Sequence, residues 1–316
     1  MTKLIIDCDP GHDDAVAILL AARHLELLGI TTVFGNQRVA HTTDNALRLL
    51  ALAGLDVPVV RGCDEALVEP PTDAAAVHGA TGMDGAELPP PVAEPLPVHA
   101  VEFLIEQARA HQGELVLAIT GAHTNVALAL RLEPRLRRWL RAITIMGGST
   151  GVGNVRPAVC INVVSDPEAA QIVFASGVLI HWVGYELTRT VLVEDGDIAR
   201  LRASGRKVAG AVADLCSFYR DRQRAVMGLQ GAPMHDSCAI VPYVRPELIA
   251  YEEVAVEVAL APGPSRGMTI ADRRHLVRGA DLGRIEPSRP ANAKLAVDAD
   301  RRAIVDLVLD TVLTYA

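Results

Sequence analysis

The sequence predicts an α/β fold: a Rossmann-like, mostly parallel central sheet with helices on both faces. In the first half of the chain, short β-rich runs alternate with segments of helical periodicity, which is the pattern of repeated strand-helix-strand units. Half of the 316 residues are apolar and 22% are charged, so the chain can bury a large core.

The predicted elements begin with an apolar strand that leads directly into acidic residues. Each expected strand is a short aliphatic run, and each expected helix spaces its apolar residues three or four positions apart. The strands are expected at 4–7, 29–35, 115–120, 142–148 and 178–184, with a later one at 252–260. The helices are expected at 13–28, 42–53, 98–111, 125–132 and 167–176, and helical spacing resumes from 198 to 227.

Composition does not divide the chain, so we expect a single domain over residues 1–316. The proline-rich stretch at about 69–97, with HGATGMDG at its centre, is expected to be a mobile loop. The helical region at about 198–234 is expected to lie beside the active site.

The charge balance argues against a nucleic-acid partner, which needs a clustered basic face. The formal net charge is -8. A short basic stretch at 135–141, with Arg135, Arg137, Arg138 and Arg141, alternates these arginines with Leu136, Trp139 and Leu140. We therefore expect its arginines to form a solvated helix face.

The sequence also predicts the protein's surroundings. No apolar export signal precedes LIID, and the longest uncharged stretch, 115–130, is too short and polar to span a bilayer. We expect a cytoplasmic protein without a membrane partner. The five cysteines form no CxxC pair, which favours reduced thiols over disulfides or a thiolate zinc site.

The strongest single feature is DCDPGHDD, at the turn from the first strand to the first helix. It places four carboxylates close together: Asp7, Asp9, Asp13 and Asp14. Such a group stays ionised most readily around a cation, and an all-oxygen set favours calcium or magnesium. Acids and proline are also ordinary at a helix start, so helix capping explains one or two of them.

Other polar residues follow the later strands, at the sheet edge where ligands bind in parallel α/β folds. MHDSCA places His235 beside Asp236, a pair that is more often structural unless the fold brings it to the aspartates. GNVRPAVCIN contributes Asn154 and Asn162, whose amides can bind hydroxyl groups or cap turns.

Taken in order, DCDPGHDD, TTVFGN, VHGATGMDG, AITGAHTN, IMGGSTGVGN, INVVSDPEAA and MHDSCA resemble the inosine-uridine nucleoside hydrolase family over nearly the whole chain. The resemblance implies a nucleoside hydrolase fold and calcium-dependent hydrolysis of the N-glycosidic bond of ribonucleosides to free base and ribose. It further implies one calcium ion per subunit and a homodimer or homotetramer.

The resemblance also assigns roles to residues. The calcium ligands would be Asp9, Asp14, the Thr120 carbonyl and Asp236. Asp9 would also be the general base, His235 the leaving-group acid or base contact, and His78 a second histidine near the nucleobase. The ribose hydroxyls would be bound by Asp13, Asn36, Asn154 and Asn162, with Asp7 in support. Asp13 would also stabilise the positive charge that develops on the ribosyl ring.

Two positions depart from the family pattern. Cys160 stands where many relatives have a glutamate that binds the ribose 5'-hydroxyl, and Ile161 replaces a phenylalanine. A thiol is a weak hydrogen-bond partner. The alternatives are a tolerated loss of affinity or a substrate altered at its 5' end.

The helix before His235 carries Tyr219, Gln223 and Met227 on one face, which would meet the nucleobase. Glutamine at the position of Gln223 resembles pyrimidine-preferring relatives and favours uridine or cytidine. The alternative is a mobile lid helix that says little about the base.

Two other classes remain open from the sequence. A haloacid-dehalogenase-like phosphatase would use Asp7 as nucleophile with magnesium, although Pro10 and the lack of a later Lys and paired-Asp set argue against it. A calcium-dependent nucleoside- or sugar-binding protein that has lost turnover is motivated by Cys160. Free ribose, phosphate or binding without product would distinguish the three.

Overall fold

The structure is a computed structural model that describes residues 1–70, 75–274 and 289–316, with the side chains of 75 and 76 excepted. Its main sheet is built from β1 Lys3–Cys8, β2 Glu26–Thr32, β3 Val59–Arg61, β4 Leu115–Ile119, β5 Ala142–Met146, β6 Ile180–Val183, β9 Ile249–Val258, β10 Thr269–Asp272 and β11 Ala293–Ala299. A separate pair is formed by β7 Leu192–Val193 and β8 Ala232–Pro233.

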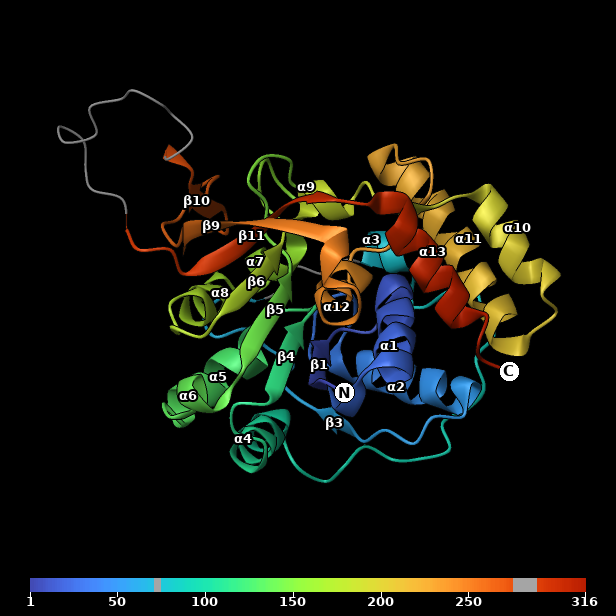
Figure 1. Ribbon diagram of the computed structural model, residues 1–316, viewed down its shortest axis with the longest axis horizontal. Helices are drawn as coiled ribbons and strands as arrows, with labels where there is room; N and C mark the ends of the chain where they lie inside the picture. The colour runs from blue at the N-terminus through green and yellow to red at the C-terminus, as the bar shows by residue number, and fades with distance from the viewer. Residues whose placement is uncertain (71–74, 275–288) are drawn as a thin grey trace.

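The helices connect and cover these strands (Figure 1). They are α1 His12–His24, α2 Val39–Ala53, α3 Ala75–His78, α4 Ala100–Ala110, α5 Thr124–Leu132, α6 Leu136–Trp139, α7 Ile161–Val164, α8 Pro167–Phe174, α9 Tyr185–Thr188, α10 Asp195–Ala203, α11 Lys207–Met227, α12 Ser237–Val244 and α13 Arg301–Val312, with a 3-10 turn at Pro246–Leu248. In the described ranges no helix is long and apolar enough to cross a membrane.

The strand order of the main sheet explains where a ligand can bind. The order is β10-β9-β11-β6-β5-β4-β1-β2-β3, and the strands from β11 to β3 run parallel. β1 pairs with β2 on one side and with β4 on the other. The chain therefore builds the sheet outwards from β1 first in one direction, through β2 and β3, and then in the other, through β4 and β5. In open α/β sheets this reversal opens a crevice at the carboxyl ends of the strands.

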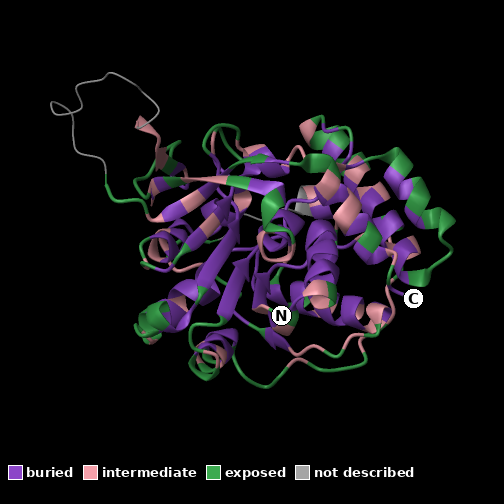
Figure 2. Ribbon diagram, viewed as in Figure 1, coloured by how far each residue is buried: buried purple, intermediate pink, exposed green. Residues whose placement is uncertain are grey.

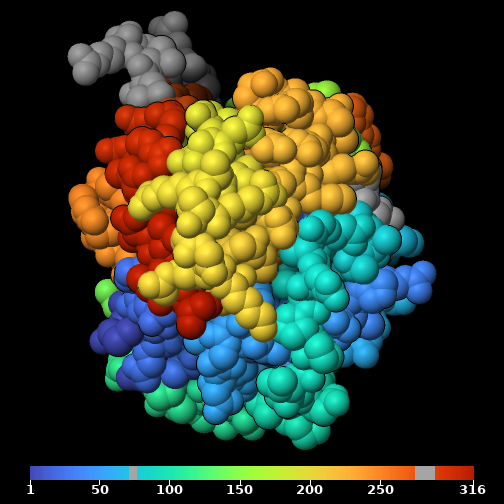
Figure 3. All heavy atoms as spheres, turned by 90° about the vertical axis from the view of Figure 1, so that its right-hand side faces the viewer, coloured from blue at the N-terminus to red at the C-terminus, as the bar shows by residue number. Residues whose placement is uncertain are grey.

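Helices cover both faces of the sheet, as predicted. One apolar core joins the sheet to α1, α2, α11, α12 and α13, and a second joins it to α4, α5 and α8. In Figure 1 these two helix groups lie on opposite sides of the strands, and Figure 2 shows the buried strands between helices whose outer faces are exposed. The side view in Figure 3 shows α10 and α11 packed as an outer layer against α13.

Helix α1 is the most enclosed of the helices around the site. Every residue from His12 to Ala21 is buried, because α1 packs against the sheet and against α11, α12 and α13. Its first turn is closed by Asp14, whose Oδ2 accepts a hydrogen bond of 2.9 Å from Gly11 N. The helix-start explanation therefore covers Asp14, which caps the helix, and Asp13, which lies in the first turn near the positive end of the helix dipole, but not Asp7 and Asp9.

Most predicted elements are confirmed, with local corrections. The helix expected at 13–28 ends at His24, because Glu26 already pairs with Lys3 in the sheet. For the same reason the strand expected at 29–35 spans Glu26–Thr32 instead. The helical spacing from 198 to 227 forms α10 and α11, and the late strand is β9.

The predictions for surface and cysteines agree with the structure. The arginines of 135–141 are exposed while Leu136 and Trp139 are buried. All five cysteines are free thiols. Residues 71–74 of the loop expected to be mobile lie outside the described residues.

Candidate functional site

A cavity of about 240 Å³ lies at the carboxyl edge of the sheet. Its lining combines acids, amides and histidines with apolar side chains. The predicted site residues on its wall are Asp13, Asn36, His78, Thr120, Asn154, Cys160, Asn162, Tyr219, Gln223, His235 and Asp236. Segments that are far apart in the sequence, from the ends of β1, β4 and β5 to α11, therefore meet at one small polar cavity.

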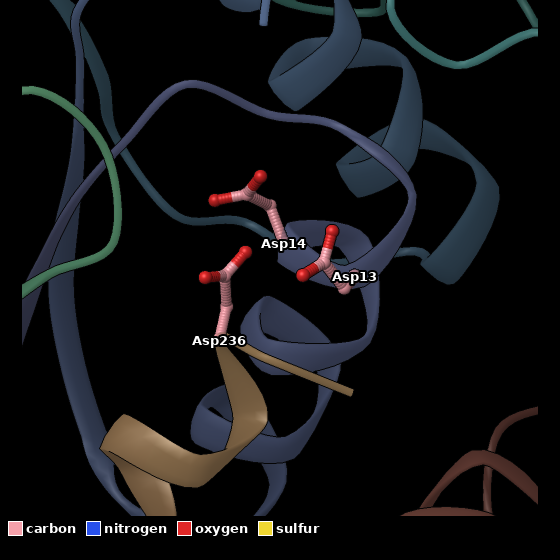
Figure 4. Close-up of side chains that lie close together, drawn as sticks. All are labelled: Asp13, Asp14 and Asp236. Carbon is pink, nitrogen blue, oxygen red and sulfur yellow. The ribbon is translucent and has the colours of Figure 1, made fainter. Parts of the chain in front are cut away.

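Three carboxylates form an acidic cluster at this edge. Asp13 and Asp14 come from the first turn of α1, and Asp236 immediately precedes α12 (Figure 4). One carboxylate oxygen of each lies within 4.8 Å of the others. All three residues are buried, and Asp13 and Asp236 also line the cavity.

Burial and mutual repulsion make this cluster costly when it is ionised. Burial and the charge of Asp14 raise the pKa of Asp13 to about 8. Burial, followed by the charges of Asp13 and Asp14, raises the pKa of Asp236 well above its usual range. A divalent cation would offset both effects, and a donor set made only of oxygens fits calcium or magnesium.

Asp9 lies beside the acidic cluster but is not one of its three members. Its Oδ2 accepts a 2.7 Å hydrogen bond from Asn36 N, and Asn36 Nδ2 donates to the Asp9 carbonyl at 2.9 Å. Burial and the charge of Asp14 raise the pKa of Asp9. The loop after β2 thus fixes Asp9, while the Asn36 amide also reaches Asp14 Oδ2 at 3.3 Å.

Thr120, at the end of β4, contacts the acidic cluster through its side chain. Its hydroxyl donates to Asp14 Oδ1 at 2.9 Å. Its carbonyl accepts a 2.5 Å hydrogen bond from Asn162 Nδ2, which also donates to the Met146 carbonyl at 3.1 Å. Asn162 therefore ties the ends of β4 and β5 together where they meet the cavity.

Asp7 is set back from the cavity and supports the loop ends. Its Oδ1 accepts hydrogen bonds from Thr31 Oγ1 at 2.6 Å and Asn125 Nδ2 at 2.8 Å. Its other oxygen is buried and has no partner among the described residues. Burial raises the pKa of Asp7 to about 7. It does not line the cavity, so it is not placed to act as a phosphatase nucleophile.

His235 lies on the cavity wall next to Asp236. Its Nδ1 is 2.7 Å from Thr188 Oγ1, and its ring packs 5.3 Å from that of Tyr185. Burial, with a smaller contribution from Arg189, lowers the pKa of His235 to about 3. The ring is therefore neutral near pH 7 and is held by α9.

A second histidine, His78 of α3, lies on another part of the wall. Its Nδ1 is 3.2 Å from Nδ1 of His12, and its ring tilts against Tyr219 at 5.2 Å. Burial lowers the pKa of both rings, to about 4 for His12 and well below its usual range for His78.

The face of α11 with Tyr219, Gln223 and Met227 does meet the cavity. Gln223 is 5% exposed, and its Oε1 is buried without a partner in the part of the chain described here. Tyr219 is also buried, so this face closes the cavity on the side of α11.

The Cys160 side of the cavity is apolar. Cys160 packs in a small cluster with Met146, Tyr185 and Ala239 against Ile161. Burial raises the pKa of its thiol to about 11, so the sulfur stays uncharged. Asn154 nearby is turned toward the backbone, where its Oδ1 accepts from Ile161 N at 2.9 Å.

Sequence reasoning missed several residues that shape the site. Tyr185 and Met146 line the cavity, Thr188 holds His235, and His12 contacts His78. His123 is fully buried with its Nδ1 3.2 Å from the Asn162 carbonyl. His12, His123 and Tyr185 had a usable signal, because each lies just after the end of a parallel strand; Thr188 had none.

Gly35 is close enough to Asp9 to give a test of the site geometry. A Cβ at Gly35 would lie 2.0 Å from Asp9 Oδ2, which must then move. We expect Gly35→Ala to lower kcat/KM by about 10²-fold, the effect of misplacing a reacting group by about 1 Å. Steady-state kinetics on the folded variant measure it. Gly210→Ala, in open space on α11, is the control and should match the wild type; equal activity of both variants would show that the position of Asp9 is unimportant.

Clustered acids beside a small histidine- and amide-lined cavity, at the switch point of a parallel sheet, are typical of an α/β enzyme that acts on a small polar substrate. Residues 4–306 match the sequence profile of the family described as inosine-uridine preferring nucleoside hydrolase. The chain belongs to this family, whose members are N-glycosyl hydrolases of nucleosides.

Individual relatives agree on the family and differ in their named substrates. The pyrimidine-specific ribonucleoside hydrolase RihA of Shewanella sp. strain ANA-3 is 40% identical, over 99% of this chain and 96% of its own length. The purine-preferring ribonucleoside hydrolase of Gardnerella vaginalis superposes with a TM-score of 0.89 at 29% identity, covering 99% and 98% of the two chains. The plant nucleoside hydrolase PpNRh1 gives 0.88 at 32% identity, covering 98% of each.

Proposed function

We propose that this protein is a calcium-dependent hydrolase of pyrimidine ribonucleosides that releases free base and ribose. The observation that carries the proposal is the buried acidic cluster of Asp13, Asp14 and Asp236 beside a cavity with a free glutamine acceptor. The acidic cluster would bind a cation and stabilise the positive charge that develops on the ribosyl ring. The unpaired Oε1 of Gln223 would accept a hydrogen bond from a nucleobase that carries an N–H donor.

The acids and amides would bind the ribose and prepare the water. Asp9, Asp14, the Thr120 carbonyl and Asp236 are the proposed ligands, and a calcium ion held there supplies a water of lowered pKa and binds sugar hydroxyls. Asp13, Asn36 and Asn162 are the proposed hydroxyl contacts, with Asn154 farther along the wall. The Asp13 carboxylate faces the cavity and stabilises positive charge on the ribosyl ring as the bond to the base breaks.

Protons then balance the reaction. Asp9 takes the proton of the attacking water while the C1'–N bond breaks toward the base. His235 gives a proton to the departing base nitrogen through the ring edge not engaged with Thr188. Because the resting ring is neutral, His235 first takes up a proton from solvent, a step favoured by the negative charge that develops on the departing base; the imidazolium then gives that proton to the base nitrogen and returns to neutral imidazole.

Gln223 supports the pyrimidine assignment. Gln223 lines the cavity, its buried Oε1 has no partner among the described residues, and an unpaired buried carbonyl is costly until a donor meets it. Both N3–H of uracil and the 4-amino group of cytosine are such donors. The RihA relatives are named pyrimidine-specific, which is the second support.

A 5'-modified nucleoside is the second candidate substrate. The Cys160 wall offers an uncharged thiol and apolar neighbours instead of a carboxylate. Such a wall binds a 5'-deoxy or 5'-alkylthio group better than a hydroxyl. This candidate keeps the same reaction and changes only the sugar.

Reducing sugar released from each nucleoside tests the proposal. Purified protein is incubated with uridine, cytidine, inosine, adenosine and 5'-deoxyuridine, with calcium and after chelation. We expect calcium-dependent release that is fastest with uridine or cytidine. Faster release from 5'-deoxyuridine would favour the second candidate, and calcium-dependent binding of these nucleosides without release would refute hydrolysis.

Metal binding is expected to release protons. Burial and mutual repulsion raise the pKa of the proposed ligand Asp236 well above its usual range and that of the neighbouring Asp13 to about 8, so a calcium ion that requires ionised carboxylates must displace a proton at pH 7. Affinity should therefore rise by up to about tenfold per pH unit between pH 6 and 8 for each proton displaced. Titration calorimetry in two buffers of different ionisation enthalpy counts the protons; identical heats in both would contradict the prediction.

The raised carboxyl pKa values also determine how the folding stability of the protein changes with pH when no cation is bound. The folded state holds protons on these carboxyls at pH values where the unfolded chain, with a pKa near 3.8, has lost them. The contribution of the acidic cluster to folding stability therefore falls as pH rises from about 4 to 8.

The proposal includes a homodimer or homotetramer in the cytoplasm, as a single domain with one calcium ion per subunit. The family resemblance supports these properties. Light scattering on the purified protein would measure the assembly.

A further inference from the structure

His12 and His78 form a pair in which one ring faces the cavity and the other does not. His12 is 1% exposed and is absent from the cavity wall, whereas His78 lies on it. Their Nδ1 atoms are 3.2 Å apart, and Nε2 of His12 is 2.8 Å from the Asp84 carbonyl oxygen. No hydrogen bond engages His78 Nε2 within the described residues.

These distances permit only one arrangement of protons on two neutral rings. A carbonyl oxygen can only accept, so the proton of His12 is on Nε2 and its Nδ1 carries a lone pair. That lone pair accepts from His78, whose single proton must then be on Nδ1. His78 is left with a bare Nε2.

The surroundings hold His12 in the orientation that this arrangement needs. Its ring stacks on Tyr219 at 5.2 Å and on Phe218 at 5.3 Å, with interplanar angles of 5° and 7°. Asp84, whose carbonyl it meets, is fixed by its own carboxylate, which accepts from Ala80 N at 2.8 Å and Thr81 N at 3.1 Å.

The turn that carries Asp84 requires a glycine. Gly79 has φ +81°, and a Cβ there would lie 2.2 Å from Asp84 Oδ2. The turn, the carbonyl and the stacked ring thus form a continuous support behind His78.

We propose that His12 is a positioning residue that holds His78 as its Nδ1–H tautomer, so that His78 offers a bare Nε2 to a hydrogen-bond donor of the substrate. The kinetic part of this inference rests on the proposed nucleoside hydrolysis; the tautomer itself does not. The two cavity histidines would then have different roles. His78 accepts a hydrogen bond from the substrate and helps to bind it, while His235 remains the proton donor.

The tautomer can be measured directly, without substrate. Protein labelled with ¹⁵N-histidine gives two-bond ¹H–¹⁵N spectra that distinguish Nδ1–H from Nε2–H rings, and the His78 signal is identified by its loss in His78→Phe. We expect Nδ1–H for His78 in the wild type. An Nε2–H ring at His78 in the wild type would overturn the proposal whether or not the protein hydrolyses nucleosides.

Two substitutions separate hydrogen bonding from packing. His12→Phe keeps a flat ring against Phe218 and Tyr219 but removes both hydrogen bonds, so His78 should lose the Nδ1–H tautomer. His12→Asn can place an amide oxygen near the lost Nδ1 and should restore it in part. His24→Phe, at the far end of α1 where His24 contacts Thr311, is the matched control and should leave the His78 signal unchanged.

Kinetics give the functional readout. We expect His12→Phe to raise KM by about 3- to 10-fold with little change in kcat, as for loss of one hydrogen bond made in both ground and transition states. In a His78→Phe background the same change should have no further effect, because His12 acts through His78. A loss mainly in kcat, or additive effects of the two changes, would contradict the proposal. If no nucleoside is hydrolysed, the proposed function fails and the spectra still decide the tautomer.

Discussion

Replacing Asp14 by asparagine should lower kcat/KM by about 10³-fold or more. Asp14 interacts with several residues in and around the acidic cluster: its oxygens accept from Gly11 N and Thr120 Oγ1, and its charge raises the pKa of Asp9 and Asp13. Asparagine keeps the size and one acceptor but removes the charge that a cation needs. Since a bound metal supplies several kcal/mol of charge stabilisation, its loss predicts this effect.

Calcium binding and steady-state kinetics on the same preparation measure the change. The control is Asp44→Asn on α2, where Asp44 pairs with Arg48 at the surface; it should remain within twofold of the wild type. If Asp14→Asn binds calcium normally or stays within tenfold of wild-type activity, the metal site has been assigned to the wrong residues.

The second large effect is expected for His235→Ala, which should lower kcat by 10²- to 10⁴-fold on uridine because the departing base is left without its proton. Thr188→Val removes only the partner of His235 Nδ1 and should have a smaller effect in the same direction.

A riboside with a 4-nitrophenolate leaving group needs no proton donor, so the His235→Ala variant should cleave it nearly as fast as the wild type. His24→Ala is the matched histidine control. An equal loss on both substrates would assign His235 to ribose binding instead of proton donation.

The sequence was most informative where one segment carries both structure and chemistry. The motif DCDPGHDD predicted a strand, a turn and a helix together, because aliphatic residues end abruptly in acids and proline. It also predicted a group of four carboxylates, of which Asp13 and Asp14 belong to the acidic cluster of the structure and Asp7 and Asp9 do not. Asp236 could join them only through the fold, because nothing local relates α12 to α1.

Tertiary contacts explain most of what the sequence did not predict. β3 has three residues and is defined by its pairing with β2, and β11 is a strand because it lies between β6 and β9. Thr188 has ordinary local surroundings and is placed against His235 only by packing; the motif locates His12, but only packing places it against His78. The membership of Asp13 in the three-carboxylate cluster, with Asp9 outside it, likewise depends on side-chain directions that spacing does not fix.

The acidic cluster also has a mechanical consequence. Asp13 and Asp14 begin α1, whereas Asp236 lies more than two hundred residues later at the start of α12. A cation shared by them acts as a reversible cross-link that closes most of the chain into one loop. The folded state gains about 4 kcal/mol when the free ion is at a thousand times its dissociation constant. An ion that serves the chemistry would then also hold the neighbouring helices α1 and α12 together, so its concentration would set how readily the protein unfolds.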